Sequence, residues 1–86
     1  MKVFIPTPLR SYTGDKAVIE ASGNTVGAAL GEIERLCPGF RFRIVDEQDG
    51  IRPHIRIFVN TSLVRDLSAA ARPDDVLHII CALSGG

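Results

Sequence analysis

Apolar residues recur along the chain with two different spacings, and one of these spacings predicts a helix. Between residues 26 and 37 they fall at intervals of three and four, which places them on one helical face. The run Ser22-Gly23-Asn24-Thr25 offers several N-cap residues before this segment. Pro38 and Gly39 follow it and disfavour further helix. We therefore predict a helix over residues 26–37.

The second spacing, a period of two, marks the strands. Alternation and short β-branched runs predict five of them, at residues 3–5, 16–20, 54–60, 63–64 and 76–81. The clearest alternates from Ile55 to Val59. The last is apolar on both faces except at one histidine, as expected inside a sheet. We assign Leu77, Ile79 and Cys81 to the side that faces the helix.

Four connecting segments are less regular. Residues 7–15 contain several turn formers and are expected to be a long loop between the first two strands. Residues 40–45 alternate apolar and basic side chains, which favours a short strand or an anchored extended segment. A single helical turn is expected over residues 67–71. Pro73, Asp74 and Asp75 are typical of a turn, so we interpret the two carboxylates as turn residues and not as catalytic groups.

The order of these elements predicts the fold class. Two strands, a helix, and then a strand, a short strand and a last strand indicate an α+β domain with a mixed four- to five-stranded sheet and one helix packed on one face. A length of 86 residues suits one hydrophobic core. We expect residues 1–86 to form a single domain that ends in a flexible tail over about residues 82–86.

Charge and hydropathy limit the classes of partner that we expect for this chain. Ten basic and ten acidic side chains cancel, so a general attraction to nucleic acid or membrane lipid is not expected. No apolar run approaches the length of a membrane span, and no signal-peptide core follows Met1. We expect a cytoplasmic protein without nucleic-acid or membrane partners. Acidic residues lie among the local arginines, which favours a mixed solvated surface over a phosphate site at Arg41, Arg43, Arg52 and Arg56.

The side chains offer little for catalysis or metal binding. Cys37 and Cys81 stand in apolar surroundings and are interpreted as buried thiols in a reducing compartment. With His54 and His78 they do not reproduce the usual spacing of zinc ligands, so no metal site is predicted. His78 is expected to face the surface or to be hydrogen-bonded. No motif of a phosphate loop, a serine nucleophile or a zinc protease is present, and we predict no catalytic residue.

The chemistry of the chain is concentrated in its last residues. The α-carboxylate of Gly86 is an anion at neutral pH, and it can attack the α-phosphate of ATP when an enzyme presents the nucleotide. Gly85 and Gly86 lack side chains, so the backbone can enter a narrow active site. Leu83 precedes this stalk and is a candidate apolar anchor in the groove of a partner.

The chain resembles the ubiquitin-like sulfur carriers of the MoaD/ThiS type over essentially its whole length. The family's fold is the β-grasp, which agrees with the element order above. The resemblance lies in the order and spacing of five runs: Val3-Phe4-Ile5-Pro6, Ala21-Ser22-Gly23-Asn24-Thr25-Val26, Ile57-Phe58-Val59-Asn60, Pro73-Asp74-Asp75-Val76-Leu77 and Gly85-Gly86.

The resemblance implies a function. An E1-like adenylyltransferase would activate Gly86 with ATP, a sulfur donor protein would supply sulfur to form a thiocarboxylate, and a downstream biosynthetic enzyme would accept that sulfur. The chain would be a cosubstrate with no bound cofactor, not an enzyme. Gly85, Ser84 and Leu83 match the stalk that enters the partner. Unlike many relatives, the chain has no proline between residues 80 and 84, and residues 40–53 resemble carriers associated with cysteine synthesis.

Two other functions remain open at this point. One is a ubiquitin-like modifier joined through Gly86 to lysines of other proteins. The other is a noncovalent β-grasp interaction subunit whose tail docks in a partner without being activated. Adenylation is common to the carrier and the modifier, so the presence or absence of covalent conjugates would separate them.

Overall fold

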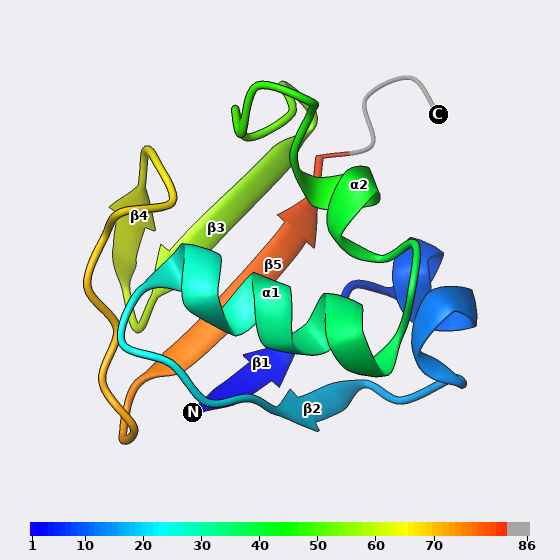
Figure 1. The fold of residues 1–86 in the computed structure, drawn as a ribbon, viewed down its shortest axis with the longest axis horizontal. Coiled ribbons are helices and arrows are strands. Elements are labelled where there is room, and N and C mark those ends of the chain that lie inside the picture. Colours follow the sequence, from blue (N-terminus) through cyan, green and yellow to red (C-terminus); the bar gives the residue numbers. More distant parts are fainter. Residues whose placement is uncertain (83–86) are drawn as a thin grey trace.

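A five-stranded sheet with the strand order β2-β1-β5-β3-β4 forms one layer of the structure (Figure 1). The computed structural model describes residues 1–82. The strands are β1 (Lys2–Phe4), β2 (Val18–Glu20), β3 (Ile55–Val59), β4 (Ser62–Val64) and β5 (Val76–Cys81). The predicted mixed sheet is therefore confirmed, and the five predicted strands all form, with slightly different ends.

The last strand occupies the centre of this sheet. β5 runs parallel to β1, with Phe4 opposite His78, and antiparallel to β3, with Ile57 opposite Ile79. Its alternate residues Leu77 and Ile79 are buried, as predicted, because their side of the sheet is covered. The strand with the most apolar sequence thus has hydrogen-bonded neighbours on both edges.

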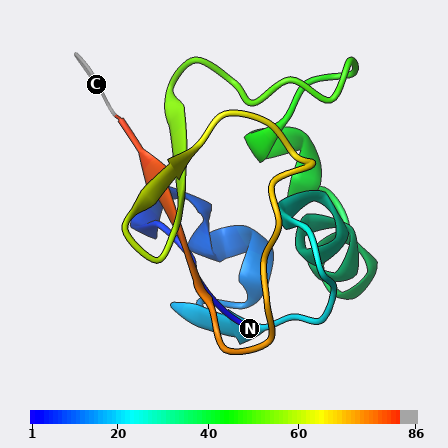
Figure 2. The ribbon, with the colours of Figure 1, turned by 90° about the vertical axis from the view of Figure 1, so that its left-hand side faces the viewer.

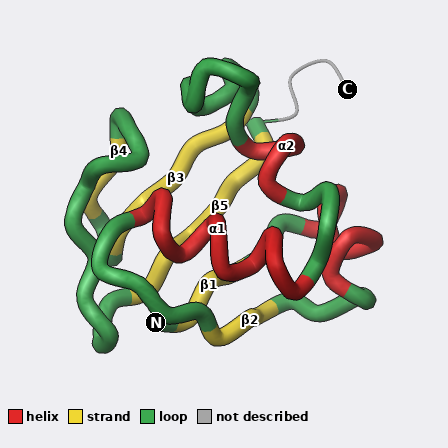
Figure 3. Tube along the Cα trace, viewed as in Figure 1, coloured by secondary structure: helices red, strands yellow, loops and turns green. Residues whose placement is uncertain are grey.

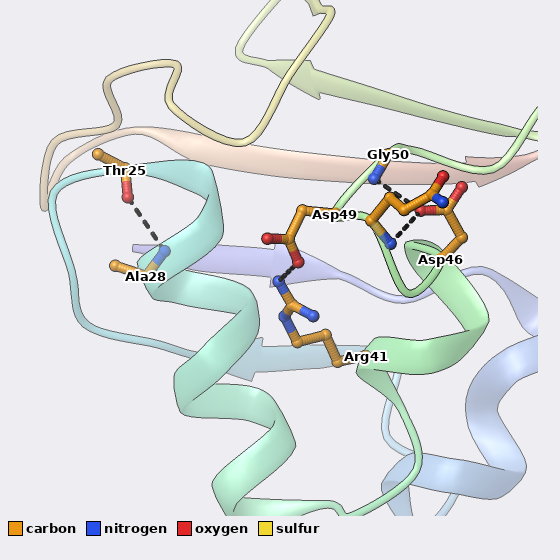
Figure 4. Close-up of polar contacts among 7 residues, drawn as sticks. Thr25, Ala28, Arg41, Asp46, Asp49 and Gly50 are labelled. Carbon is orange, nitrogen blue, oxygen red and sulfur yellow. Dashed lines mark hydrogen bonds and ion pairs between the residues drawn. The ribbon is translucent and has the colours of Figure 1, made fainter.

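Helix α1 (Val26–Leu36) lies across one face of the sheet and confirms the predicted helix (Figure 2). Its N-cap is Thr25, whose Oγ1 accepts a 3.0 Å hydrogen bond from the Ala28 amide (Figure 4). The helix ends before Pro38, since the residue preceding a proline avoids helical geometry. Four of its apolar residues are buried against the sheet: Val26, Ala29, Leu30 and Ile33.

The first turn of α1 lies close to the segment after β4. Gly27 donates its amide to the Leu67 carbonyl at 2.9 Å, and a Cβ on Gly27 would lie 3.2 Å from both the Cβ and the carbonyl oxygen of Leu67. Gly31, one turn later, has nothing within 4 Å of such a Cβ. Of these two helical glycines, only Gly27 therefore lies close to another backbone segment.

This difference predicts opposite effects of one substitution at two positions of the same helix. Gly31→Ala should raise the free energy of unfolding by about 1 kcal/mol, because alanine is the better helix former. Gly27→Ala should lower it, because the new methyl group crowds backbone atoms that a hydrogen bond holds in place. Urea unfolding of the two variants and the parent measures both. An equal gain in both variants would contradict the close packing at Gly27.

The prediction for residues 40–45 was wrong. These residues contain the short helix α2 (Arg41–Ile44), not a strand or extended segment (Figure 3). Phe40 and Ile44, four residues apart, are both fully buried, and the alternating pattern hid this helical pair. The turn is held by Glu34, whose carboxylate accepts the amides of Gly39 at 2.9 Å and Arg41 at 2.8 Å.

Two further segments differ from the sequence predictions. The expected loop over residues 7–15 contains a 3-10 helix, η1 (Thr7–Thr13), which begins after Pro6 and ends at Gly14 in the left-handed conformation. Residues 67–71 do not form the expected helical turn: Leu67 and Ser68 belong to a turn, and Ala70 forms an isolated β-bridge with Thr25. There the carbonyls of Leu67 and Ala69 accept the first amides of α1, so they are not available for a helix of their own.

The carboxylate of Glu34 makes the stability of the fold depend on pH. The amides of Gly39 and then Arg41 lower its pKa below the ordinary value of about 4.3. A lowered folded-state pKa stabilises the protein above the ordinary pKa, and this contribution is lost as the pH falls through the lowered value.

We therefore expect Glu34→Gln to reduce the free energy of unfolding by about 1 kcal/mol at pH 7, a value discounted for solvent exposure. The difference from the parent should shrink towards pH 3. Urea unfolding at the two pH values measures it, with the exposed Glu47→Gln as the matched control. A deficit of the same size at both pH values would rule out the role of the Glu34 charge.

Candidate functional site

The candidate site begins where β5 ends. Beyond Cys81, the Ala82 amide donates a 2.7 Å hydrogen bond to the His54 carbonyl, which extends the pairing of β5 with β3 by one residue. The residues predicted to carry the function, Leu83, Ser84, Gly85 and Gly86, lie outside the described residues. The structure therefore shows what surrounds Ala82, the residue that precedes them.

Two segments flank this point. In Figure 1, α2 and the loop that follows it lie beside the end of β5. A shallow pocket there is lined by Phe42, Arg43, Arg52 and His54. Arg52 lies with its guanidinium carbon 4.4 Å from the centre of the Phe42 ring and donates its Nε to the Phe42 carbonyl at 2.8 Å. The end of β5 thus lies next to an aromatic and cationic surface.

The loop after α2 is held by its own carboxylates. Asp46 accepts the amides of Gln48 and Gly50, each at 2.9 Å (Figure 4). The Gly50 amide is the larger cause of a pKa of Asp46 below its usual range. Asp49 forms a 2.9 Å ion pair with Arg41 of α2. These contacts fix the loop against α2.

The sheet face opposite α1 carries a row of apolar and aromatic side chains. Strand pairing aligns one residue from each of the five strands: Val18, Phe4, His78, Phe58 and Leu63. The rings of Phe4 and His78 stack with their centres 4.8 Å apart and an angle of 9° between their planes. Figure 2 shows α1 and α2 on the other side of the sheet, and three members of the row, Phe4, Val18 and Leu63, are exposed. We call these five residues the open-face row.

His78 belongs to this row and not to a catalytic centre. The residue is half-exposed, which confirms the prediction that it faces the surface. Alternation along the sequence indicates the buried positions, but it does not show that the apolar residues between them form one surface. Phe4 on β1 and Phe58 on β3 become one surface with His78 only through the pairing of both strands with β5.

The environment of Cys81 does not favour a nucleophilic thiol. Cys37 and Cys81 are free thiols and are half-buried, less than the predicted full burial. Burial raises the pKa of the Cys81 thiol, which opposes formation of the reactive thiolate. Within residues 1–82, no group of three histidine, cysteine or acidic side chains is placed to hold a metal ion.

Other predicted roles are clear from the contacts. The carboxylate of Asp75 accepts the Arg72 amide at 2.8 Å and the Asn60 side-chain amide at 3.0 Å, which confirms its role in the turn before β5. These two donors, the Arg72 amide first, lower the pKa of Asp75.

In the part of the chain described here, no helix is long and apolar enough to cross a membrane.

The fold places the protein in the β-grasp, ubiquitin-like class, with a helix across one face of a mixed sheet whose central strand leads to the tail. A model of the ThiS family matches residues 3–86. The chain belongs to the ThiS family.

Individual relatives agree with this assignment. The sulfur carrier protein CysO of Mycobacterium tuberculosis is 35% identical over 89 residues, which cover 98% of this chain and 96% of the relative. The crystal structure of the BexX/CysO complex of Amycolatopsis orientalis contains a chain with 35% identity and a TM-score of 0.93, over 99% of this chain and 98% of that one.

A more distant structure shows the fold alone. The small archaeal modifier protein 1 of Methanosarcina acetivorans is 23% identical, with a TM-score of 0.82, over 99% of this chain and 94% of that one.

These findings decide between the functional hypotheses. The family and the 35% identity to CysO support a sulfur-carrier role, and they support the cysteine-biosynthesis branch of the carriers. Proteins of this type are small carriers and are not themselves enzymes. The protein modifier and the noncovalent interaction subunit are not favoured, because the curated relatives at 35% identity are named sulfur carriers, whereas the modifier structures are related at the level of fold only.

Proposed function

We propose that the carboxylate of Gly86 is the group that this carrier presents for activation. A carboxylate oxygen attacks the α-phosphorus of ATP in the active site of an E1-like adenylyltransferase, and pyrophosphate leaves. A sulfur nucleophile at the oxidation level of sulfide, supplied by a donor protein, then displaces AMP from the acyl carbon. The product is a thiocarboxylate in which one oxygen of Gly86 has been replaced by sulfur.

The observation that carries this proposal is the family match, which runs through the closing glycines to residue 86. Gly85, Ser84 and Leu83 would form the stalk that enters the active site of the partner, continuing a single domain of residues 1–86. ATP would be bound by the activating enzyme and not by the carrier.

The similarity to carriers of the cysteine-biosynthesis branch indicates which class of enzyme accepts the sulfur. The relatives named CysO are 35% identical over 98% of this chain. We propose that the thiocarboxylate of this chain donates its sulfur to an enzyme of cysteine synthesis. The supply of ATP and the two free cysteines suit the cytoplasm as the compartment of this exchange.

The thiocarboxylate is directly measurable by intact mass spectrometry. Incubation with an E1-like enzyme of the same cell, ATP and a sulfur donor should shift the mass of the full chain by the exchange of one oxygen for sulfur. Deletion of Gly86 should abolish the shift and leave the unfolding midpoint unchanged, because the deleted residue lies beyond the last strand. Conversion of the deletion variant to a thiocarboxylate would refute the assignment of Gly86.

The open-face row is the surface through which we propose that the E1-like enzyme holds the domain. Its central member His78 lies on β5, the strand that leads into the tail, so an enzyme that takes the tail also reaches this row. Phe4 is 38% exposed there, and its ring can enter an apolar pocket of the enzyme.

Phe4→Ser should therefore raise the KM of the E1-like enzyme for the carrier about tenfold, since buried aromatic anchors carry much of the energy of an interface. Leu36→Ser is the matched control, because Leu36 is 52% exposed on the helix layer away from this face. Steady-state adenylation with varied carrier concentration measures both. Equal KM values for the two variants would exclude the open face as the docking surface.

A further inference from the structure

Four arginines form a continuous band beside the end of β5. Arg52 lines two neighbouring shallow pockets, one together with Arg43 and His54 and the other together with Arg56 and Arg65. We call Arg43, Arg52, Arg56 and Arg65 the arginine band. Its members come from α2, from the segment before β3, from β3 and from the residue after β4.

Strand pairing places this band next to the base of the tail. Arg56 on β3 is directly opposite Ile80 on β5. The carbonyl of His54, between Arg52 and Arg56 in sequence, accepts the Ala82 amide at 2.7 Å. A partner that encloses the residues after Ala82 therefore contacts the band.

The band carries positive charge that is not neutralised by ion pairs. Among residues 1–82 the ion pairs of side chains join Arg35 with Glu32 and Arg41 with Asp49, and none includes a member of the band. The acidic neighbours are engaged elsewhere: Asp46 binds amides of its own loop, and Asp66 binds Ser68. Asp46 is near enough for the Arg52 charge to contribute to its lowered pKa, without forming an ion pair.

Uncharged groups contact three of these arginines, Arg43, Arg52 and Arg56. Arg56 donates Nη1 to the carbonyls of Pro53 at 2.6 Å and Ile55 at 3.1 Å. Arg52 is held by the ring and the carbonyl of Phe42, and the guanidinium carbon of Arg43 lies 5.1 Å from the centre of the Tyr12 ring. Side chains fixed in this way lose less conformational entropy on binding, and their remaining N–H groups can pair with carboxylates.

We infer that the arginine band is a docking surface for acidic side chains of the E1-like enzyme, located around the entrance to its adenylation site. This inference rests on the proposed function of the tail. The band is spread over two neighbouring pockets, which offers several separate sites for carboxylates of a protein surface. The chain has no net charge, so the attraction is local to the base of the tail.

Charge reversal tests the inference in the full chain with the E1-like enzyme that adenylates it. Arg52→Glu and Arg56→Glu should each raise the KM for the carrier about tenfold, and added salt should reduce kcat/KM of the parent more than that of the variants. Saturating carrier should restore kcat. Arg72→Glu, which makes the same change of charge in the turn before β5, at the opposite end of the sheet, should leave the KM for the carrier unchanged.

The variants also separate docking of a protein from binding of nucleotide. Urea unfolding of every variant checks that it still folds. Arg52→Gln and Arg56→Gln remove the charge without reversing it, so they should raise the KM for the carrier less than the Glu variants do. A raised KM for ATP with an unchanged KM for the carrier would assign the band to nucleotide phosphates and overturn the inference. Unchanged KM values in all band variants would also overturn it, although adenylation itself would then stand. A parent chain that is never adenylated would refute the proposed function and this inference together.

Discussion

The position of β5 between β1 and β3 is the constraint on which the rest of the structure depends. β5 is hydrogen-bonded along both edges, and its residues Leu77 and Ile79 are buried under α1. The chain therefore leaves the sheet from a strand inside it and not from an edge strand. Among the described residues, β1 pairs with Val76 to His78, whereas Ile79 to Cys81 pair with β3 alone. An enzyme that draws the tail into an active site would therefore load the ladder with β3 first, and the ladder with β1 only from His78 onwards.

The elements that dominate the fold were predictable because each has its own periodicity. The stripe of α1 and the alternation of β3 need no tertiary information. Residues 40–45 were mispredicted because Phe40, Phe42 and Ile44 fit alternation, while Phe40 and Ile44 also fit a helical turn. The helical turn forms because the Glu34 carboxylate accepts hydrogen bonds from the amides of Gly39 and Arg41. The local apolar pattern does not specify this contact.

The candidate site was predictable to a different degree. The closing glycines and the short runs shared with sulfur carriers pointed to the family, which the comparisons confirmed. The open-face row and the arginine band were not predictable, because both depend on strand order. Phe4 and His78 are far apart in sequence and stack only because β1 pairs in parallel with β5. The interspersed acidic residues suggested a balanced surface, but Asp49 is paired with Arg41 and leaves the neighbouring arginines uncompensated.

The two edge strands of the sheet affect how readily copies of the carrier associate with one another. Both edge strands, β2 and β4, are only three residues long. A strand of this length exposes few unpaired amides and carbonyls, so it is a poor template for the addition of another chain. Contacts through side chains on the faces of the sheet are then favoured over the addition of a strand at its edges.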